Sequence, residues 1–349
     1  MKRITIPILL LITLTSAVRA TEFKDSKLEN SQETHLVNIR QLTFGGENAE
    51  AYFSHDGTKL IFQSTRPPYD CDQIFIMKAD GSEVRLLSTG KGRTTCSFLF
   101  PDQKKFLYAS THLGDEGCPP EPDRSLGYVW PLYNTFDIFS ANLDGSGLTR
   151  LTGAPGYDAE GAVSPDGEKI VFTSVRDGDL ELYTMNTDGS GVKRLTHREG
   201  FDGGPFFSWD GKFIVYRSHY PDSDSDLKDY RDLLSRDLMR PVRAEIYLMN
   251  ADGSGQRQIT DDGWANWSPF MYPDSRRIIY SSNKHDPERR TFSLYMVNAD
   301  GSGEERVTFG ARFDSFPMFS RDGRQLVWCS TRNAKSRHEF NIFIADWVD

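Results

Sequence analysis

The sequence predicts an all-β fold, a six-bladed β-propeller of four-stranded antiparallel blades. Three observations carry this prediction: one turn motif repeats six times, a second repeats five times, and the spacing between them is fixed. A serine follows the aspartate of the first motif after eight residues, and the second motif, mostly D-G-S-G, begins 22 residues before the next copy of the first. The first motif, S-x-D-G in its best copies, has its aspartate at Asp56, Asp102, Asp166, Asp210, Asp274 and Asp322.

Each copy of the repeat contains four strand-like segments separated by turns. In the third copy they cover residues 161–164, 169–174, 180–186 and 192–196, and they are rich in β-branched and aromatic residues. Asp-Gly pairs supply the positive φ angles that tight hairpins need, so each copy should fold as four antiparallel strands. Four strands in about 45 residues is the size of one propeller blade.

The last copy contains only three of the four segments, and we expect the N-terminal part of the chain to supply the fourth. The run V-N-I-R-Q-L-T at 37–43 matches the R-L-T segments of other copies. It should lie beside residues 341–347 and close the ring without leaving an open strand edge. The expected organisation is a signal peptide at 1–20, a short linker at 21–36 and the propeller at 37–349.

The first 20 residues have the pattern of a signal peptide. Lys2 and Arg3 precede an apolar run that is too short to cross a bilayer, and Val18 and Ala20 offer a cleavage site. Cleavage near Ala20 would give a periplasmic or secreted protein that does not insert into the membrane. It would remove three basic residues, including Arg19, and change the net charge from −9 to −12. Because such an acidic surface repels phosphate backbones, we expect no nucleic-acid partner. We also expect the protein to be a monomer.

The four cysteines are too few for a disulfide scaffold, but export would allow a disulfide to form. Cys71 and Cys118 both lie in loops between the second and third strands of adjacent blades, and we expect them to pair. Cys96, near the same end of the second blade, is the competing partner.

Two loops break the regularity of the repeat. The spacing from the second-strand serine to the next D-G turn is 34 residues in the second and fourth blades, but 14 in the third. These loops share one face of the propeller, and long loops on a rigid scaffold often carry binding sites. The sequence therefore predicts two walls with a ligand-binding cleft above the third blade.

The floor of this expected site comes from the third blade. Asp158 and Glu160 lie two residues apart on one strand, so their side chains should share one side, with Arg176 nearby. Ion pairs that hold the blades together are the alternative for these charged residues. The walls combine imidazole and aromatic side chains, which could stack on a sugar or simply anchor their loops: His112, Tyr128, Trp130, His219 and Tyr220.

We expect no cofactor, but a divalent metal stays an open alternative. Imidazoles from several loops can converge on one ion, although five scattered surface histidines are the simpler interpretation. Asp222, Asp224 and Asp226 resemble the start of a calcium loop, yet the glycine and glutamate of an EF-hand are missing. A helix N-terminus explains these aspartates more simply. The histidines in question are His112, His197, His219, His285 and His338.

The repeat resembles the WD40-like PD40 repeat of the TolB propeller, through its R-L-T, S-P-D-G and L-Y-x-M-N-x-D-G segments. Similar blades occur in oligogalacturonate lyases. The resemblance covers residues 37–349 and implies the fold more strongly than an activity. We expect an exported, non-catalytic module of the cell envelope that binds a protein or an oligosaccharide, and we assign no catalytic residue. The alternative is a carbohydrate-active enzyme similar to a metal-dependent oligogalacturonate lyase.

Overall fold

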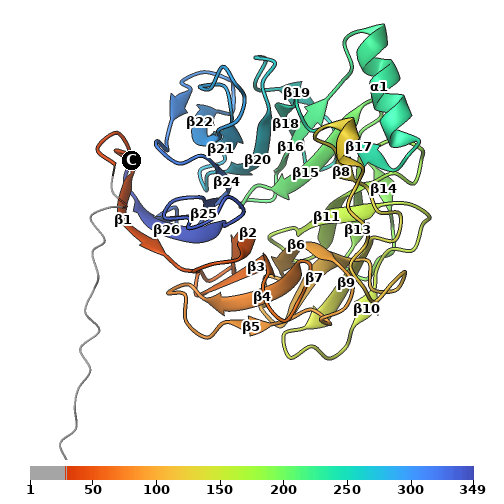
Figure 1. Cartoon of the computed structure of the whole chain (residues 1–349), viewed down its shortest axis with the longest axis horizontal. Coiled ribbons are helices and arrows are strands. Elements are labelled where there is room, and N and C mark those ends of the chain that lie inside the picture. Colours follow the sequence, from red (N-terminus) through yellow and green to blue (C-terminus); the bar gives the residue numbers. More distant parts are fainter. Residues whose placement is uncertain (1–27, 29) are drawn as a thin grey trace, which may run out of the picture.

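The computed structural model describes residue 28 and residues 30–349, which form a ring of six four-stranded antiparallel sheets (Figure 1). Each sheet is one blade, and the predicted six-bladed propeller is confirmed. In the first five blades the strands follow the sequence from the ring axis outward. One more sheet, of two short strands, joins loops of the second and fourth blades.

The inner strands of each blade are long. The innermost strands, in blade order, are β2 (Glu47–Phe53), β6 (Thr94–Leu99), β11 (Asp158–Val163), β15 (Phe201–Phe207), β20 (Asn266–Met271) and β24 (Asp314–Phe319). The second strands are β3 (Lys59–Thr65), β7 (Lys105–Ser110), β12 (Lys169–Ser174), β16 (Phe213–His219), β21 (Arg277–Ser282) and β25 (Gln325–Ser330).

The third strands are as long as the inner ones, and the fourth strands are short in the first five blades. The third strands are β4 (Gln73–Lys78), β9 (Asp137–Asn142), β13 (Glu181–Asn186), β18 (Glu245–Asn250), β22 (Ser293–Asn298) and β26 (Asn341–Trp347). The fourth strands are β5 (Arg85–Leu86), β10 (Thr149–Arg150), β14 (Lys193–Arg194), β19 (Arg257–Gln258), β23 (Glu305–Arg306) and β1 (Leu36–Gln41). The long loops add η1 (Arg124–Leu126), β8 (Trp130–Pro131), α1 (Asp224–Leu234) and β17 (Leu238–Met239).

The N-terminal strand closes the ring, as predicted. β1 runs antiparallel to β26, with Leu36 opposite Trp347. The side chains of Leu36, Ile39 and Leu42 are buried against the blade. The strand edge of β26 is therefore covered, which protects it from pairing with other chains.

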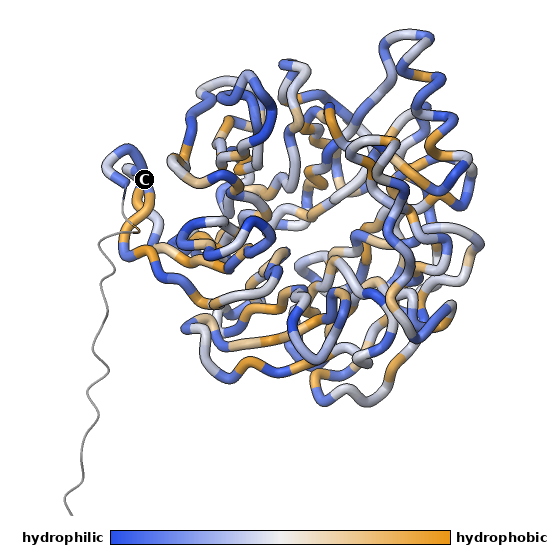
Figure 2. Tube along the Cα trace, in the orientation of Figure 1, coloured by the Kyte–Doolittle hydropathy of each residue, from blue (hydrophilic) through white to orange (hydrophobic). Residues whose placement is uncertain are grey.

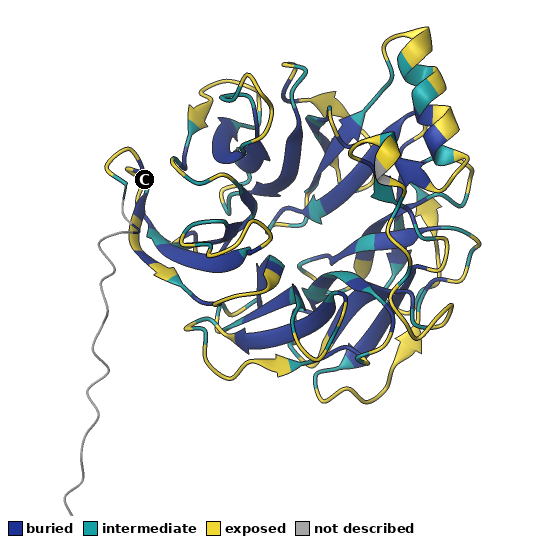
Figure 3. Cartoon of the chain, viewed as in Figure 1, coloured by how far each residue is buried: buried dark blue, intermediate teal, exposed yellow. Residues whose placement is uncertain are grey.

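The core lies between neighbouring blades. Apolar segments run along the strands, and hydrophilic residues occupy the connecting loops (Figure 2). The strands are also the largely buried part of the chain (Figure 3). β12 shows the consequence, because five of its six residues in succession are buried. Both faces of such a strand pack against other blades, so its sequence lacks the alternation of a half-exposed strand.

Each innermost strand carries one irregularity at the same place. Six residues before the first-motif aspartate, the backbone has a positive φ, and the pairing with the second strand shifts by a bulge. Only one of these six residues is glycine. They are Glu50 (52°), Cys96 (49°), Glu160 (57°), Gly204 (57°), Ser268 (49°) and Phe316 (54°).

Helix α1 is the one α-helix of the described residues, and no helix in that part of the chain is long and apolar enough to cross a membrane. The signal peptide expected at residues 1–20 lies outside the described residues.

A chain begun at residue 44 should be much less stable than a chain begun at residue 28. The shorter chain lacks the buried side chains of Leu36, Ile39 and Leu42 and exposes the edge of β26. Each buried aliphatic side chain contributes about 1.5–3 kcal/mol, so the melting temperature measured by calorimetry should fall by about 10 °C or more. Equal melting temperatures would show that ring closure does not depend on β1.

Candidate functional site

The two long loops meet above the ring and pair with each other. β8, from the second blade, runs antiparallel to β17, from the fourth, with Trp130 opposite Met239 (Figure 1). The amide of Leu132 also donates a hydrogen bond to the carbonyl of Asp237 at 2.7 Å. We name this two-stranded ribbon the strap. The loops therefore form a cover, where the sequence analysis expected two separate walls.

Apolar packing holds the strap in place. Leu132 and Met239 are buried in one cluster with Phe136 and with Tyr230 of helix α1. The hydroxyl of Tyr230 donates to the carbonyl of Gly200 at 2.7 Å, which ties the helix to the fourth blade. The strap is thus fixed to the propeller from both loops.

Helix α1 also accounts for the three aspartates that resemble a calcium loop. Asp224 and Asp226 lie in its first turn, where carboxylates are favoured by the helix dipole. Asp222 pairs with Arg243 at 2.6 Å, and Asp226 lies 3.1 Å from His219. Within the described residues, no three His, Cys, Asp or Glu side chains lie close enough together to hold a metal ion.

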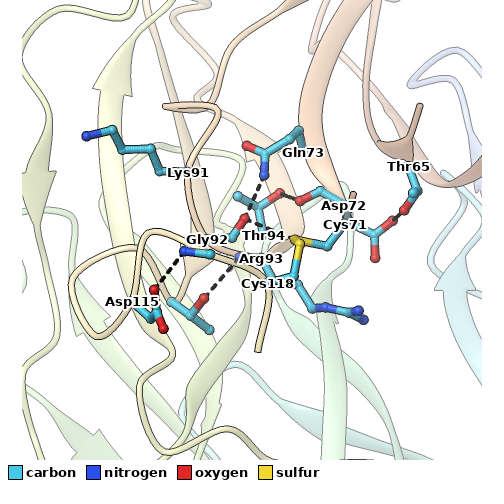
Figure 4. The surroundings of a disulfide bond; sticks show 12 residues. Thr65, Cys71, Asp72, Gln73, Lys91, Gly92, Arg93, Thr94, Asp115 and Cys118 are labelled. Atoms are coloured by element: carbon cyan, nitrogen blue, oxygen red, sulfur yellow. Dashed lines mark hydrogen bonds between the residues drawn. A yellow bond between two sulfur atoms is a disulfide. The ribbon is translucent and has the colours of Figure 1, made fainter. Parts of the chain in front are cut away.

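A disulfide fixes the loop of the second blade to the first blade. Cys71 and Cys118 are bonded, with their Cα atoms 5.9 Å apart, which confirms the predicted pairing. Figure 4 shows the bond beside Gln73, whose side-chain amide donates to the carbonyl of Gly92 at 2.7 Å. Cys96, the competing partner, is a free thiol.

Beneath the strap lies a cavity of about 300 Å³ on the ring axis. All six left-handed residues of the innermost strands line it, and Trp130 and Met239 of the strap cover it. Eleven of its 27 lining residues are aromatic and five are charged. A covered aromatic cavity with an open side and a few charged groups is a usual form of a small-ligand site.

Glu160 and Arg217 form an ion pair in the wall of this cavity. The other oxygen of Glu160 accepts hydrogen bonds from the Thr173 hydroxyl and the Gly204 amide, both at 2.7 Å. The guanidinium carbon of Arg217 lies 5.3 Å from the centre of the Trp130 ring. Both oxygens of Glu160 are engaged, so this carboxylate joins the third and fourth blades, and its partner Arg217 contacts the strap through Trp130.

Glu50 lines the same cavity but makes no ion pair with any described residue. Burial raises the pKa of its carboxyl group to about 7, while a hydrogen bond with the Cys96 thiol lowers it. Burial also raises the pKa of the Cys96 thiol well above its ordinary value, so this thiol is not an activated nucleophile.

Asp72 and Arg93 supply the other two charges of the lining. Asp72 accepts a hydrogen bond from the Thr65 hydroxyl at 2.7 Å, and burial raises the pKa of its carboxyl group. Arg93 pairs with Glu121 at 2.7 Å. The guanidinium groups of Arg93 and Arg217 are therefore both paired with protein carboxylates.

Three of the eight predicted ligand residues line the cavity: Glu160, Tyr128 and Trp130. Asp158 and Arg176, expected in the floor, instead pair with each other at 2.9 Å. Their pairing agrees with the alternative interpretation, in which charged residues hold the blades together.

His112, His219 and Tyr220, expected in the walls, do not line the cavity. His112 contacts the hydroxyl of Ser110 at 2.8 Å, and Tyr220 donates to Asp202 at 2.8 Å, each within its own blade. His219 faces helix α1. The cavity thus lies on the ring axis under the strap rather than above the third blade.

The bulge in β11 separates Asp158 from Glu160. Regular alternation would place both side chains on one side of the strand. The pairing shifts between Ala159 and Ala162, however, and Glu160 has a positive φ. Glu160 consequently faces the axis while Asp158 faces its own blade.

Sequence reasoning missed Glu50, Cys96 and Arg217. The first two occupy the position six residues before the first-motif aspartate, where the six copies have almost no residue in common. That variability inside an otherwise regular repeat is the signal that could have identified them. Arg217 stands immediately before a second-strand serine, and no other copy has a charged residue there.

Replacing both Cys71 and Cys118 by serine should lower the free energy of unfolding by about 4 kcal/mol, because the bond closes a loop with a sequence separation of 47 residues. Denaturant unfolding measures this loss. Reductant should destabilise the wild-type protein by a similar amount and leave the double variant unchanged. A wild-type protein that does not respond to reductant would contradict the role given to this bond.

Glu50→Gln should stabilise the protein at pH 8 and have little effect at pH 5. The folded pKa of about 7 lies above the ordinary glutamate value of about 4.3. The contribution of Glu50 to stability is therefore fully present below about pH 4.3 and is lost as the pH rises through about 7. At pH 8 the ionised, half-buried carboxylate costs on the order of 2 kcal/mol once solvent screening is allowed for, and glutamine removes this cost.

Denaturant unfolding at the two pH values tests this expectation. The exposed Glu168, replaced by glutamine, serves as the control and should show no such pH dependence. Equal stability of Glu50→Gln and wild type at pH 8 would show that Glu50 is not buried as an unpaired carboxylate.

Solved structures share this fold at low sequence identity. A TolB candidate from Agrobacterium tumefaciens is 18% identical, with a TM-score of 0.60 over 89% of this chain and 97% of that one. TolB from Acinetobacter baumannii is 18% identical, with a TM-score of 0.56 over 87% of this chain and 64% of that one, so the chain spans less than two thirds of that protein. Oligogalacturonate lyase from Vibrio parahaemolyticus is 16% identical, with a TM-score of 0.52 over 88% and 93%. Such similarities concern the fold alone.

No curated protein matches the chain. The family model of the TolB beta propeller domain matches residues 124–228, which run from η1 of the second blade into helix α1 of the fourth. The chain is therefore a six-bladed β-propeller that contains a segment similar to the TolB beta propeller domain.

Proposed function

We propose that the chain is an exported, non-catalytic binding protein of the cell envelope, whose axial cavity holds a small ligand or the end of a peptide or oligosaccharide. The observation that carries this proposal is the strap. Two loops that begin on different blades pair over the ring axis and cover a cavity of about 300 Å³. A cavity of that size suits a ligand of a few residues or sugar units at most.

The lining supports recognition of a ligand that has both an apolar and a polar face. Trp130 and Trp267 lie with their ring centres 5.4 Å apart, and both line the cavity. Such rings offer flat surfaces for a sugar or an apolar side chain. The buried indole nitrogen of Trp267 has no hydrogen-bond partner among the described residues. Charged groups beside these rings would then orient the polar side of the ligand.

The engagement of the ionisable groups favours binding over catalysis. Acid–base catalysis by paired carboxylates needs two groups that are free to exchange protons with a substrate. Both oxygens of Glu160 are engaged by protein donors. Burial keeps the thiol of Cys96 protonated. Asp72 accepts a hydrogen bond from the Thr65 hydroxyl, so Glu50 is the cavity carboxylate that is most free to act on a ligand.

The alternative function, a metal-dependent lyase, requires imidazoles that converge on one ion. His112 and His219 contact Ser110 and Asp226, and His285 contacts Thr291. Similarity to the oligogalacturonate lyase of Vibrio parahaemolyticus supports the shared fold but adds no ligand set for a metal.

Export is supported by two independent features. The first 20 residues have the pattern of a signal peptide. The Cys71–Cys118 disulfide is stable in an oxidising compartment such as the periplasm.

Trp130→Ala should weaken ligand binding by about tenfold or more, because one stacked aromatic ring contributes about 0.5–1.5 kcal/mol beyond the apolar area that it buries. Calorimetric titration with short oligosaccharides, amino sugars and dipeptides measures the affinity. Trp264→Ala is the matched control, because Trp264 is partly buried but does not line the cavity. Binding that survives Trp130→Ala unchanged would place the ligand elsewhere and contradict the proposed function.

A further inference from the structure

Two carboxylates of the cavity, Glu50 and Asp72, form no ion pair with any described residue, and Asp72 accepts a hydrogen bond from the Thr65 hydroxyl, which Glu50 lacks. Arg217 lines the cavity too, but it is paired with Glu160 and acts on Glu50 only as a more distant charge. Arg93 is paired with Glu121. A carboxylate enclosed by protein without a cation is costly unless a ligand supplies the opposite charge.

Aromatic side chains surround this carboxylate. The ring centres of Tyr52 and Phe206 lie 5.1 Å apart, and both rings line the cavity. The charge of Glu50 acts on the hydroxyls of both Tyr52 and Tyr157. Burial holds the pKa of both hydroxyls well above the ordinary value, so they remain neutral.

The balance of charge in the lining is negative. Three carboxylates, Glu50, Asp72 and Glu160, face the two guanidinium groups of Arg93 and Arg217. An anionic ligand would therefore meet repulsion, and a neutral polyhydroxyl ligand would leave the charge of Glu50 in place. A cation next to a carboxylate and between aromatic faces gains from both kinds of interaction.

We propose that the axial cavity binds a ligand with a protonated amine, whose ammonium group pairs with Glu50 between the surrounding aromatic rings. This proposal rests on the proposed function, because it names the chemical class of ligand for the same cavity. The volume of about 300 Å³ accommodates one small amine, an amino-sugar unit or the amino end of a peptide.

The test compares tyramine with 4-ethylphenol, which has the same ring but no amine, and with the neutral disaccharide cellobiose. Calorimetric titrations at pH 8 use the wild-type protein, Glu50→Gln, Trp130→Ala and the control Glu168→Gln. Glutamine has nearly the shape of glutamate and removes only the charge, so the variant should fold, and its melting temperature verifies this.

We expect tyramine to bind the wild-type protein and Glu168→Gln equally. Its affinity should be at least tenfold lower for Glu50→Gln, and 4-ethylphenol should bind the wild-type protein at least tenfold more weakly than tyramine. Equal tyramine affinities for wild type and Glu50→Gln, or equal affinities for the two phenols, would overturn the proposal.

The outcomes also separate this proposal from the proposed function. Tyramine binding that is lost in Trp130→Ala but unchanged in Glu50→Gln, or cellobiose binding without tyramine binding, would overturn the amine proposal and keep the axial cavity as the binding site. Tyramine binding that is insensitive to both Trp130→Ala and Glu50→Gln would overturn both.

Discussion

Each innermost strand has one residue with a left-handed backbone that faces the ring axis, and these six positions line the cavity. Five of the six residues carry a side chain, although a left-handed backbone costs such residues about 1–2 kcal/mol each. The packed blades on either side hold the bulges in place. Strained positions of this kind concentrate at functional sites. Here they bring Glu50, Cys96 and Glu160 to the axis, together with Ser268 and Phe316.

The cavity also depends on contacts between parts of the chain that are far apart in sequence. β1 closes the ring on β26, the disulfide joins the first two blades, and the strap joins the second and fourth. The pair Glu160–Arg217 then connects the third blade, the fourth blade and the strap indole. Each of these contacts fixes the position of the elements that surround the cavity. A rigid enclosure lowers the ordering cost of ligand binding, which favours a recognition role.

The fold was predictable because its signals are local and repeated. Asp-Gly turns at fixed spacing specify the hairpins, and the V-N-I-R-Q-L-T run at 37–43 specifies the closing strand. The Cys71–Cys118 pair followed from equivalent loops on adjacent blades. The site was less predictable. Trp130 could be inferred from loop length. The bulge that separates Asp158 from Glu160 has its left-handed backbone at Glu160 and not at the adjacent Gly161, so strand alternation assigned Asp158 to the wrong environment.

The central claim is that ligands bind in the axial cavity under the strap, and fluorine NMR of 5-fluorotryptophan-labelled protein tests it most directly. Of the six tryptophans, Trp130 and Trp267 line this cavity, whereas Trp209 lies at the opposite mouth of the ring. During titration with tyramine, the resonances of Trp130 and Trp267 should shift together and saturate, while that of Trp209 stays in place. Shifts confined to Trp209, or to the outer Trp264, would contradict the claim.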